Sequence, residues 1–122
     1  MLRIFAAVGV LGLSAQVASA DILQCNFNPS QARGWAPEVM YFDTTRDTIR
    51  FARKEVKLSS SGSSYFWRVS LRSNLGSHQR VKYTLRVGDG AGVGRPVNSQ
   101  MIIEVKGTQK ERANGTCEIY AG

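Results

Sequence analysis

Side chains that could carry covalent or acid–base chemistry are few in this chain. It has two cysteines, Cys25 and Cys117, and one histidine, His78. A nucleophilic triad needs its histidine beside a nucleophile in a pocket, whereas His78 falls in a segment of turn-forming residues. No group of His, Cys and carboxylate residues has the spacing of a metal site. The sequence therefore predicts a protein that is not an enzyme and that uses neither a metal nor another cofactor.

The glycine-rich run at 88–94 is a second place to look for chemistry. Glycines in alternation can expose backbone N–H groups to a phosphate. A nucleotide-binding fingerprint requires a helix directly after its glycines. Here Arg95 and Pro96 lead instead into a strand pattern, which indicates a hairpin loop.

The first twenty residues have the three parts of a secretory signal peptide. Met1 to Arg3 form a short positive start, residues 4–13 are apolar apart from two glycines, and Ala18-Ser19-Ala20 is a small-x-small cleavage pattern. The apolar run is too short for a spanning helix, which needs roughly twenty residues. We expect cleavage after Ala20, one domain at 21–122, no transmembrane segment, and a periplasmic or secreted location.

An even number of cysteines in an exported chain indicates a disulfide. Cys25 and Cys117 lie near the two ends of the mature region, whereas redox and metal pairs usually have close spacing such as C-x-x-C. We therefore predict a disulfide between them. Loop-entropy models give about 4–5 kcal/mol for closing a loop of roughly ninety residues.

Apolar and polar residues alternate with a period of two along the mature region, which indicates strands. In the first strand Leu23, Cys25 and Phe27 would face inward. Residues 38–42 and 48–53 would form a hairpin, with Val39 facing Phe51 and Tyr41 facing Ile49 across it. The other segments are 65–72, 81–87, 100–106 and 116–120, an optional short edge strand at 54–58, a flexible polar loop at 59–64 and a turn at 110–115. The fold class is all-β: a small antiparallel barrel or sandwich of six to seven strands, with the first and last strands joined by the disulfide.

The clearest pattern is a central hairpin folded about Gly76. It would pair Tyr65 with Val87, Trp67 with Leu85, Val69 with Tyr83 and Leu71 with Val81. Arg72 would then lie opposite Arg80, and like charges in direct opposition destabilise a sheet. An anionic ligand on this face would explain that arrangement; the alternative is a solvated face whose cations pair with acids such as Glu104 and Glu118. The anion-binding candidates are Arg68, Arg72, Arg80, Lys82 and Arg86.

The formal net charge of +7 favours acidic partners. Export and the single aromatic residue on the basic face, Phe66, argue against nucleic acid, which usually stacks on several aromatic side chains. We therefore expect an extracytoplasmic binding or accessory domain that is not an enzyme, with an acidic envelope polymer or protein as its partner. A structural envelope component is the alternative, and the oligomeric state stays open.

Two resemblances add to this interpretation. The segments Cys25-Asn26-Phe27, Gly34-Trp35-Ala36-Pro37 and Asn114-Gly115-Thr116-Cys117 resemble those of small exported bacterial β-proteins of uncharacterised function. The string Ser61-Gly62-Ser63-Ser64-Tyr65 is similar to the S-G-x-x-Y loop that periplasmic β-barrel lysozyme inhibitors insert into the lysozyme cleft. This second resemblance implies an inhibitor of lysozyme or another hydrolase whose loop acts through Ser61, Gly62 and Tyr65.

Overall fold

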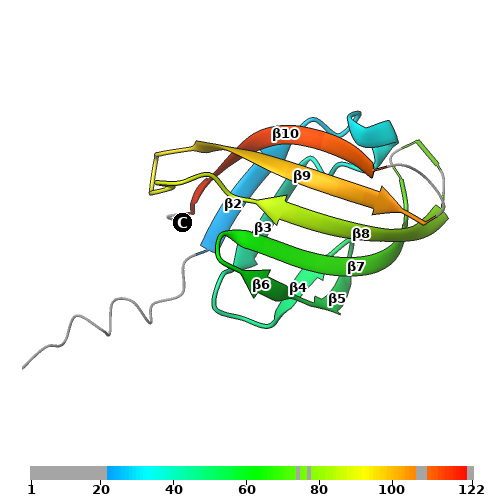
Figure 1. The fold of residues 1–122 in the computed structure, drawn as a ribbon, viewed down its shortest axis with the longest axis horizontal. Coiled ribbons are helices and arrows are strands. Elements are labelled where there is room, and N and C mark those ends of the chain that lie inside the picture. Colours follow the sequence, from blue (N-terminus) through cyan, green and yellow to red (C-terminus); the bar gives the residue numbers. More distant parts are fainter. Residues whose placement is uncertain (1–21, 74, 77, 107–109, 121–122) are drawn as a thin grey trace, which may run out of the picture.

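The computed structural model describes residues 22–73, 75–76, 78–106 and 110–120, and these form an all-β fold. Seven strands make one antiparallel sheet in the order β3-β2-β10-β9-β8-β7-β6, while β4 and β5 form a separate two-stranded ribbon. Figure 1 shows the sheet curling into a half-barrel, with the ribbon at its open side. The strands are β2 (Ile22–Phe27), β3 (Val39–Asp43), β4 (Thr48–Phe51), β5 (Lys54–Lys57), β6 (Ser59–Ser61), β7 (Ser64–Arg72), β8 (His78–Arg86), β9 (Val97–Val105) and β10 (Lys110–Ile119).

The predicted disulfide between Cys25 and Cys117 is present and joins β2 and β10, the first and last strands in the sequence. The two cysteines are direct partners in the antiparallel β2–β10 ladder, and their Cα atoms are 4.0 Å apart. Gly115 has no Cβ, which allows β10 to pass close to the backbone of Asn26 in β2. The disulfide therefore fixes a contact between two neighbouring strands that lie far apart in the sequence.

The central hairpin forms, but its predicted register is wrong by two residues. Trp67 lies opposite Tyr83 instead of Leu85, and Val69 lies opposite Val81 instead of Tyr83. A shift of two keeps every side chain on its expected face, because faces alternate with a period of two. The predicted opposition of Arg72 and Arg80 is also wrong: Arg72 faces His78.

The hairpin predicted from residues 38–42 and 48–53 is wrong. β3 pairs with β2, and β4 pairs with β5 across the turn that follows Phe51. Met40 and Phe42 are the buried residues of β3, whereas Val39 and Tyr41 are 43% and 48% exposed. The apolar residue at every position from Val39 to Phe42 explains the error, because such a run does not show which face points inward.

Two segments predicted as loops contain strands. Ser59–Ser61 is strand β6, which pairs with the start of β7 across a tight turn at Gly62, whose φ is +62°. Residues 110–115, predicted as a polar turn, form the first half of β10 and pair with β9. Both segments are mostly polar and solvent-facing, so neither shows the inward apolar alternation that marks a half-buried strand.

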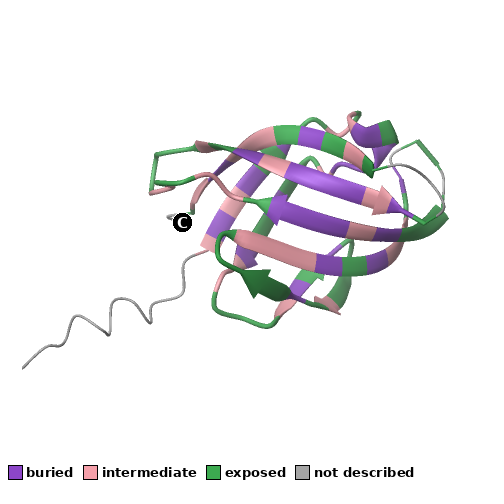
Figure 2. Cartoon of the chain, in the orientation of Figure 1, coloured by how far each residue is buried: buried purple, intermediate pink, exposed green. Residues whose placement is uncertain are grey.

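The core lies inside the curl of the sheet, as the buried residues in Figure 2 show. At its centre the rings of Trp67 and Tyr83 stack with centroids 5.5 Å apart, and Phe51 of the ribbon contacts both rings. The Tyr83 hydroxyl donates a 2.7 Å hydrogen bond to the Trp35 carbonyl oxygen in the connector between β2 and β3. Burial raises the pKa of Tyr83. These contacts join the hairpin, the ribbon and the connector into one core.

No helix of the described residues is long and apolar enough to span a bilayer. The signal peptide predicted at residues 1–20 lies outside the described residues.

Candidate functional site

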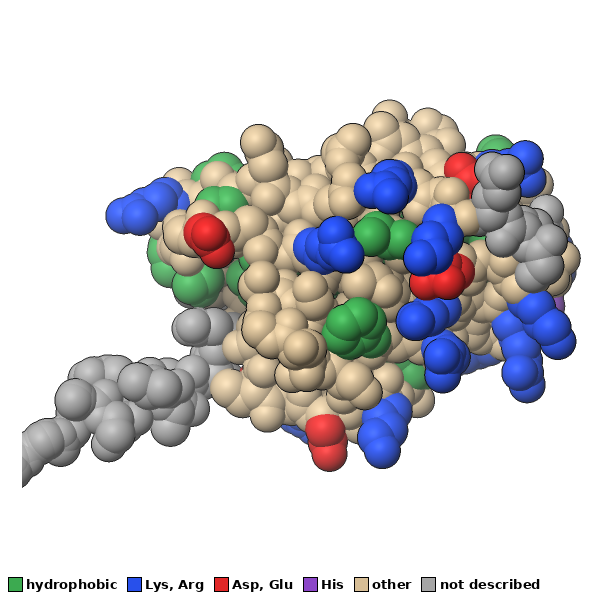
Figure 3. All heavy atoms as spheres, viewed as in Figure 1, with side chains coloured by type: hydrophobic (Ala, Val, Ile, Leu, Met, Phe, Trp, Pro, Cys, Tyr) green, Lys and Arg blue, Asp and Glu red, His purple; other side chains and the backbone are tan. Residues whose placement is uncertain are grey.

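A groove of about 430 Å³ lies on the outer face of the sheet, over strands β7 and β8 and the end of β9. Figure 3 shows Lys and Arg side chains gathered on this side of the molecule. We call the hollow the basic groove; its lining consists of Arg68, Val69, Ser70, Arg80, Val81, Lys82, Glu104 and Lys106. Four of these eight side chains are cationic and one is acidic.

Two of the cations are crowded together by the strand register. Arg68 and Lys82 are direct partners in the β7–β8 ladder. The Val87 amide donates to the Ser63 carbonyl oxygen at 3.1 Å, and hydrogen-bonded pairs alternate along an antiparallel ladder. Arg68 and Lys82 are consequently a non-hydrogen-bonded pair, the kind in which side chains lie closest. Like charges in this position destabilise the sheet, so the like-charge cost expected between Arg72 and Arg80 falls on Arg68 and Lys82 instead.

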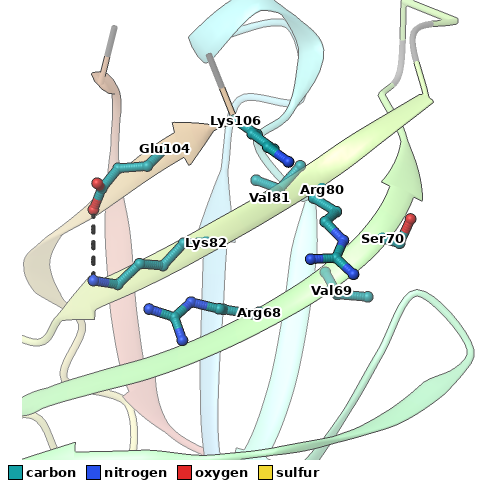
Figure 4. Close-up of a pocket in the computed structure, with 8 residues that line it drawn as sticks. All are labelled: Arg68, Val69, Ser70, Arg80, Val81, Lys82, Glu104 and Lys106. Carbon is teal, nitrogen blue, oxygen red and sulfur yellow. Dashed lines mark ion pairs between the residues drawn. The ribbon is translucent and has the colours of Figure 1, made fainter. Parts of the chain in front are cut away.

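The other two cations approach the groove from a second row. The Lys106 amide donates to the Arg80 carbonyl oxygen at 3.1 Å, which places the two residues side by side on β8 and the end of β9. In Figure 4 Arg80 points toward β7 and Lys106 points toward β8. The cations therefore reach the hollow from β7, from β8 and from the residue that follows β9.

Glu104 neutralises part of this charge. Its carboxylate lies 3.8 Å from the Lys82 ammonium group, as the dashed line in Figure 4 marks. Each side chain of the pair is about one-third exposed, so solvent weakens their attraction. Glu104 is the one acidic residue among four cations in the lining of the groove, so the local charge stays positive.

A second hollow, of about 350 Å³, adjoins the basic groove. Arg68 and Lys82 line both hollows, and the second also includes Lys57 and Phe66. On the outer face Phe66 lies opposite Thr84, which lies opposite Ile102. Although both face outward, Thr84 and Ile102 are buried, so a short apolar row runs beside the cations. A ligand could combine charged contacts in one hollow with apolar contacts in the next.

The structure brings together three of the five predicted anion-binding residues. Arg68, Arg80 and Lys82 line the basic groove. Arg72 lines a different hollow, beside Tyr83, and Arg86 lines another at the far end of β8. Sequence reasoning missed Lys106 because its place depends on which strand follows β8 in the sheet. The outward alternation from Glu104 to Lys106 was the available signal.

The residues of the predicted inhibitor loop occupy the β6–β7 turn. Ser61 and Gly62 are exposed, and nothing lies within 4 Å of the position that a Gly62 Cβ would take. Tyr65, by contrast, packs its ring against Phe42 with centroids 5.0 Å apart, and partial burial raises its pKa. In this arrangement the turn presents serines and glycine to solvent and holds the tyrosine ring against the core.

Comparison of the chain with protein-family models, with curated proteins and with solved structures finds no match in any of the three. The basic groove therefore has to be interpreted from its own geometry.

Proposed function

We propose that the protein is an extracytoplasmic binding domain, not an enzyme, that holds an anionic envelope polymer on its outer face. The single observation that carries this proposal is the convergence of Arg68, Arg80, Lys82 and Lys106 on one hollow with one acid beside them. Cations crowded in this way repel one another. A bound anion would be attracted to each cation and would offset the repulsion between them.

The side chains in the groove suit phosphate or carboxylate groups. Arginine presents a planar fork of N–H donors that matches both groups in a bidentate way, whereas lysine supplies a compact charge. Two arginines and two lysines line the groove, and one of each also lines the adjoining hollow. This arrangement fits several anionic groups better than one. We infer a polymer that carries repeated phosphate or carboxylate groups. An acidic protein is the competing partner that the experiment below distinguishes.

The proposal is tested by capture from the envelope fraction of the source cells at low and high salt. Purified, oxidised protein is compared with Arg68→Gln/Arg80→Gln, which removes two charges from the groove. The matched control, Arg86→Gln/Arg95→Gln, removes two charges at exposed positions outside it. Far-ultraviolet circular dichroism checks that all three proteins are folded.

We expect the wild type and the control to retain a polymer at low salt and release it at high salt, because salt screens exposed charges. The groove variant should retain little at either salt concentration. Equal capture by the groove variant and the control would refute a localised site. A single protein retained at high salt would show that the partner is a protein and not a polymer.

A further inference from the structure

The half-barrel has one side where consecutive strands do not pair. β3 and β4 belong to different sheets although the chain passes from one to the other through residues 44–47. Two hollows, of about 470 and 330 Å³, lie between these strands, and Tyr41 and Arg50 line both. We call the region between β3 and β4 that holds both hollows the seam.

The backbone of β3 faces the seam at alternate residues. The Phe27 amide donates to the Glu38 carbonyl oxygen at 2.9 Å, and the two residues are partners one step beyond the β2–β3 ladder. Because hydrogen-bonded pairs alternate along an antiparallel ladder, Met40 and Phe42 direct their backbone groups to β2. Val39 and Tyr41 consequently direct their N–H and C=O groups away from β2, toward the seam.

The same reasoning applies to the opposite wall. The Leu58 amide donates to the Asp47 carbonyl oxygen at 2.7 Å, one step beyond the β4–β5 ladder. Ile49 and Phe51 therefore pair with β5, whereas Thr48 and Arg50 direct their backbone groups toward the seam. The ribbon is attached to the other side of the barrel, where Lys54 donates to the Ser70 carbonyl oxygen and Phe51 packs on Trp67.

The larger hollow behind the seam has a definite chemical character. Its inner wall includes Met40, Phe51, Leu71 and Tyr83, all apolar or aromatic. Arg50 and Arg72 also line it, and no acidic residue does, whereas the smaller hollow of the seam has Asp43 and Glu55 beside its arginines. A side chain that enters this hollow should be apolar, and an acidic group beside it would meet two arginines.

We propose that the seam binds an extended, acidic peptide segment of a partner protein, which adds a strand to β3. Main-chain hydrogen bonds to Val39 and Tyr41 would hold the segment, as in other cases of strand addition to a sheet edge. Alternate side chains would point into the apolar hollow, because faces alternate along a strand. An acidic group beside the inserted side chain would pair with Arg50 or Arg72. This site is separate from the basic groove and does not depend on the function proposed for it.

Amide hydrogen exchange tests whether the β3 amides that face the seam are unpaired in the free protein. The Met40 and Phe42 amides should be protected by β2, whereas the Val39 and Tyr41 amides should exchange at the rate of exposed groups. Protection of Val39 and Tyr41 in the free protein would show that β3 and β4 pair directly in solution. That result would overturn the proposal.

Selection from a displayed library of random twelve-residue peptides tests the ligand. We expect the purified, oxidised protein to enrich acidic peptides with apolar residues at every second position. Binding of an enriched peptide should protect the Val39 and Tyr41 amides from exchange. Failure to enrich such a pattern, or enrichment without protection of these amides, would overturn the proposal.

Two substitutions at one position separate the backbone contact from the side chain. Tyr41→Pro removes an N–H that points into the seam and leaves the β2 ladder intact, since proline is tolerated on edge strands. Tyr41→Thr removes the ring and keeps the N–H. Peptide affinity should fall at least about tenfold in Tyr41→Pro relative to Tyr41→Thr, with the β2–β3 amide protection unchanged in both. Equal affinity of the two variants would contradict strand addition.

Discussion

The hairpin β7–β8 and the pair β3–β4 are both formed by consecutive strands, yet the first pair is fully hydrogen-bonded and the second does not pair. β7 and β8 are paired over nine residues and their inward side chains form the centre of the core. β3 is instead held by β2, and β4 by β5. Pairing therefore depends on which other strands compete for an edge, and nearness in sequence alone does not decide it.

The two regions also differ in what they can offer a partner. The hairpin and β9 present side-chain cations on strands joined by continuous ladders, so the charges of the basic groove are held on a rigid support. The seam offers unpaired backbone groups and an apolar hollow. One region should therefore bind through charge, with strong salt dependence, and the other through main-chain hydrogen bonds, with weak salt dependence.

Removal of the disulfide should have the largest effect and should act mainly on the seam. Cys25→Ala/Cys117→Ala frees the β2–β10 contact on which β3 depends. With 92 residues separating the cysteines, the loss in unfolding free energy should be about 4–5 kcal/mol, measured by urea denaturation. Hydrogen exchange should show Met40 and Phe42 losing protection before Val81. Simultaneous loss at all three amides would show that the two regions open as one unit.

Phe51→Ala should detach the ribbon from the core. Phe51 contacts Trp67 and Tyr83 with ring centroids 5.3 and 4.7 Å away, and truncation of a buried Phe costs about 3–5 kcal/mol. The Ile49 and Val56 amides should lose exchange protection more than those of the β7–β8 hairpin. An exposed control on the same ribbon, Arg53→Ala, tests for effects unrelated to packing. A smaller loss in Phe51→Ala than in this control would exclude the proposed anchoring.

Tyr83→Phe should weaken the link between the hairpin and the connector that leads into β3. It leaves the buried Trp35 carbonyl oxygen without its 2.7 Å hydrogen bond, at a cost of about 1–3 kcal/mol. Burial raises the pKa of Tyr83 above the ordinary value of 10.0, so the unfolded chain loses this proton first. Stability should therefore fall as the pH rises above 10, and less steeply in the variant. Parallel profiles of unfolding free energy against pH would contradict this role.

Arg68→Gln should have the smallest effect and the opposite sign. It removes the like-charge opposition with Lys82 and should stabilise the free protein by about 0.2–1 kcal/mol in dilute buffer. The gain should shrink in high salt because the repulsion is screened. Thermal denaturation at two salt concentrations measures it, with Arg86→Gln as the control. A destabilised Arg68→Gln variant would mean that the cation packs favourably in the free protein.

The sequence was sufficient for the features that depend on local alternation and on cysteine count. The all-β class, the Cys25–Cys117 disulfide and the inward residues of the central hairpin are confirmed. The predicted register was wrong by two residues. The inward residues Tyr65, Trp67 and Val69 meet an apolar or aromatic partner in either alignment, so the pattern did not distinguish the two. A one-residue slip would have reversed the faces, and this did not occur.

The remaining features depend on long-range competition between strands. β2 lies between β10 and β3 in the sheet, and no local pattern shows this strand order. The two-residue register error placed Arg72 opposite Arg80, whereas the structure puts Arg80 beside Lys106 and Arg72 beside the seam. Three of the four cations of the basic groove could be named in advance, but their grouping could not.

The most direct test of the proposed function is calorimetric titration of the purified protein with two defined polyanions, linear polyphosphate and polygalacturonate. We expect at least one of the two polymers to bind in dilute buffer and its affinity to fall as the salt concentration rises. Charge-assisted hydrogen bonds contribute about 1.5–3 kcal/mol each, so Arg68→Gln/Arg80→Gln should lower affinity by at least about tenfold. Arg86→Gln/Arg95→Gln should lower it by no more than about twofold. Absence of binding by both polymers, or equal losses in the two variants, would contradict a polyanion site in the basic groove.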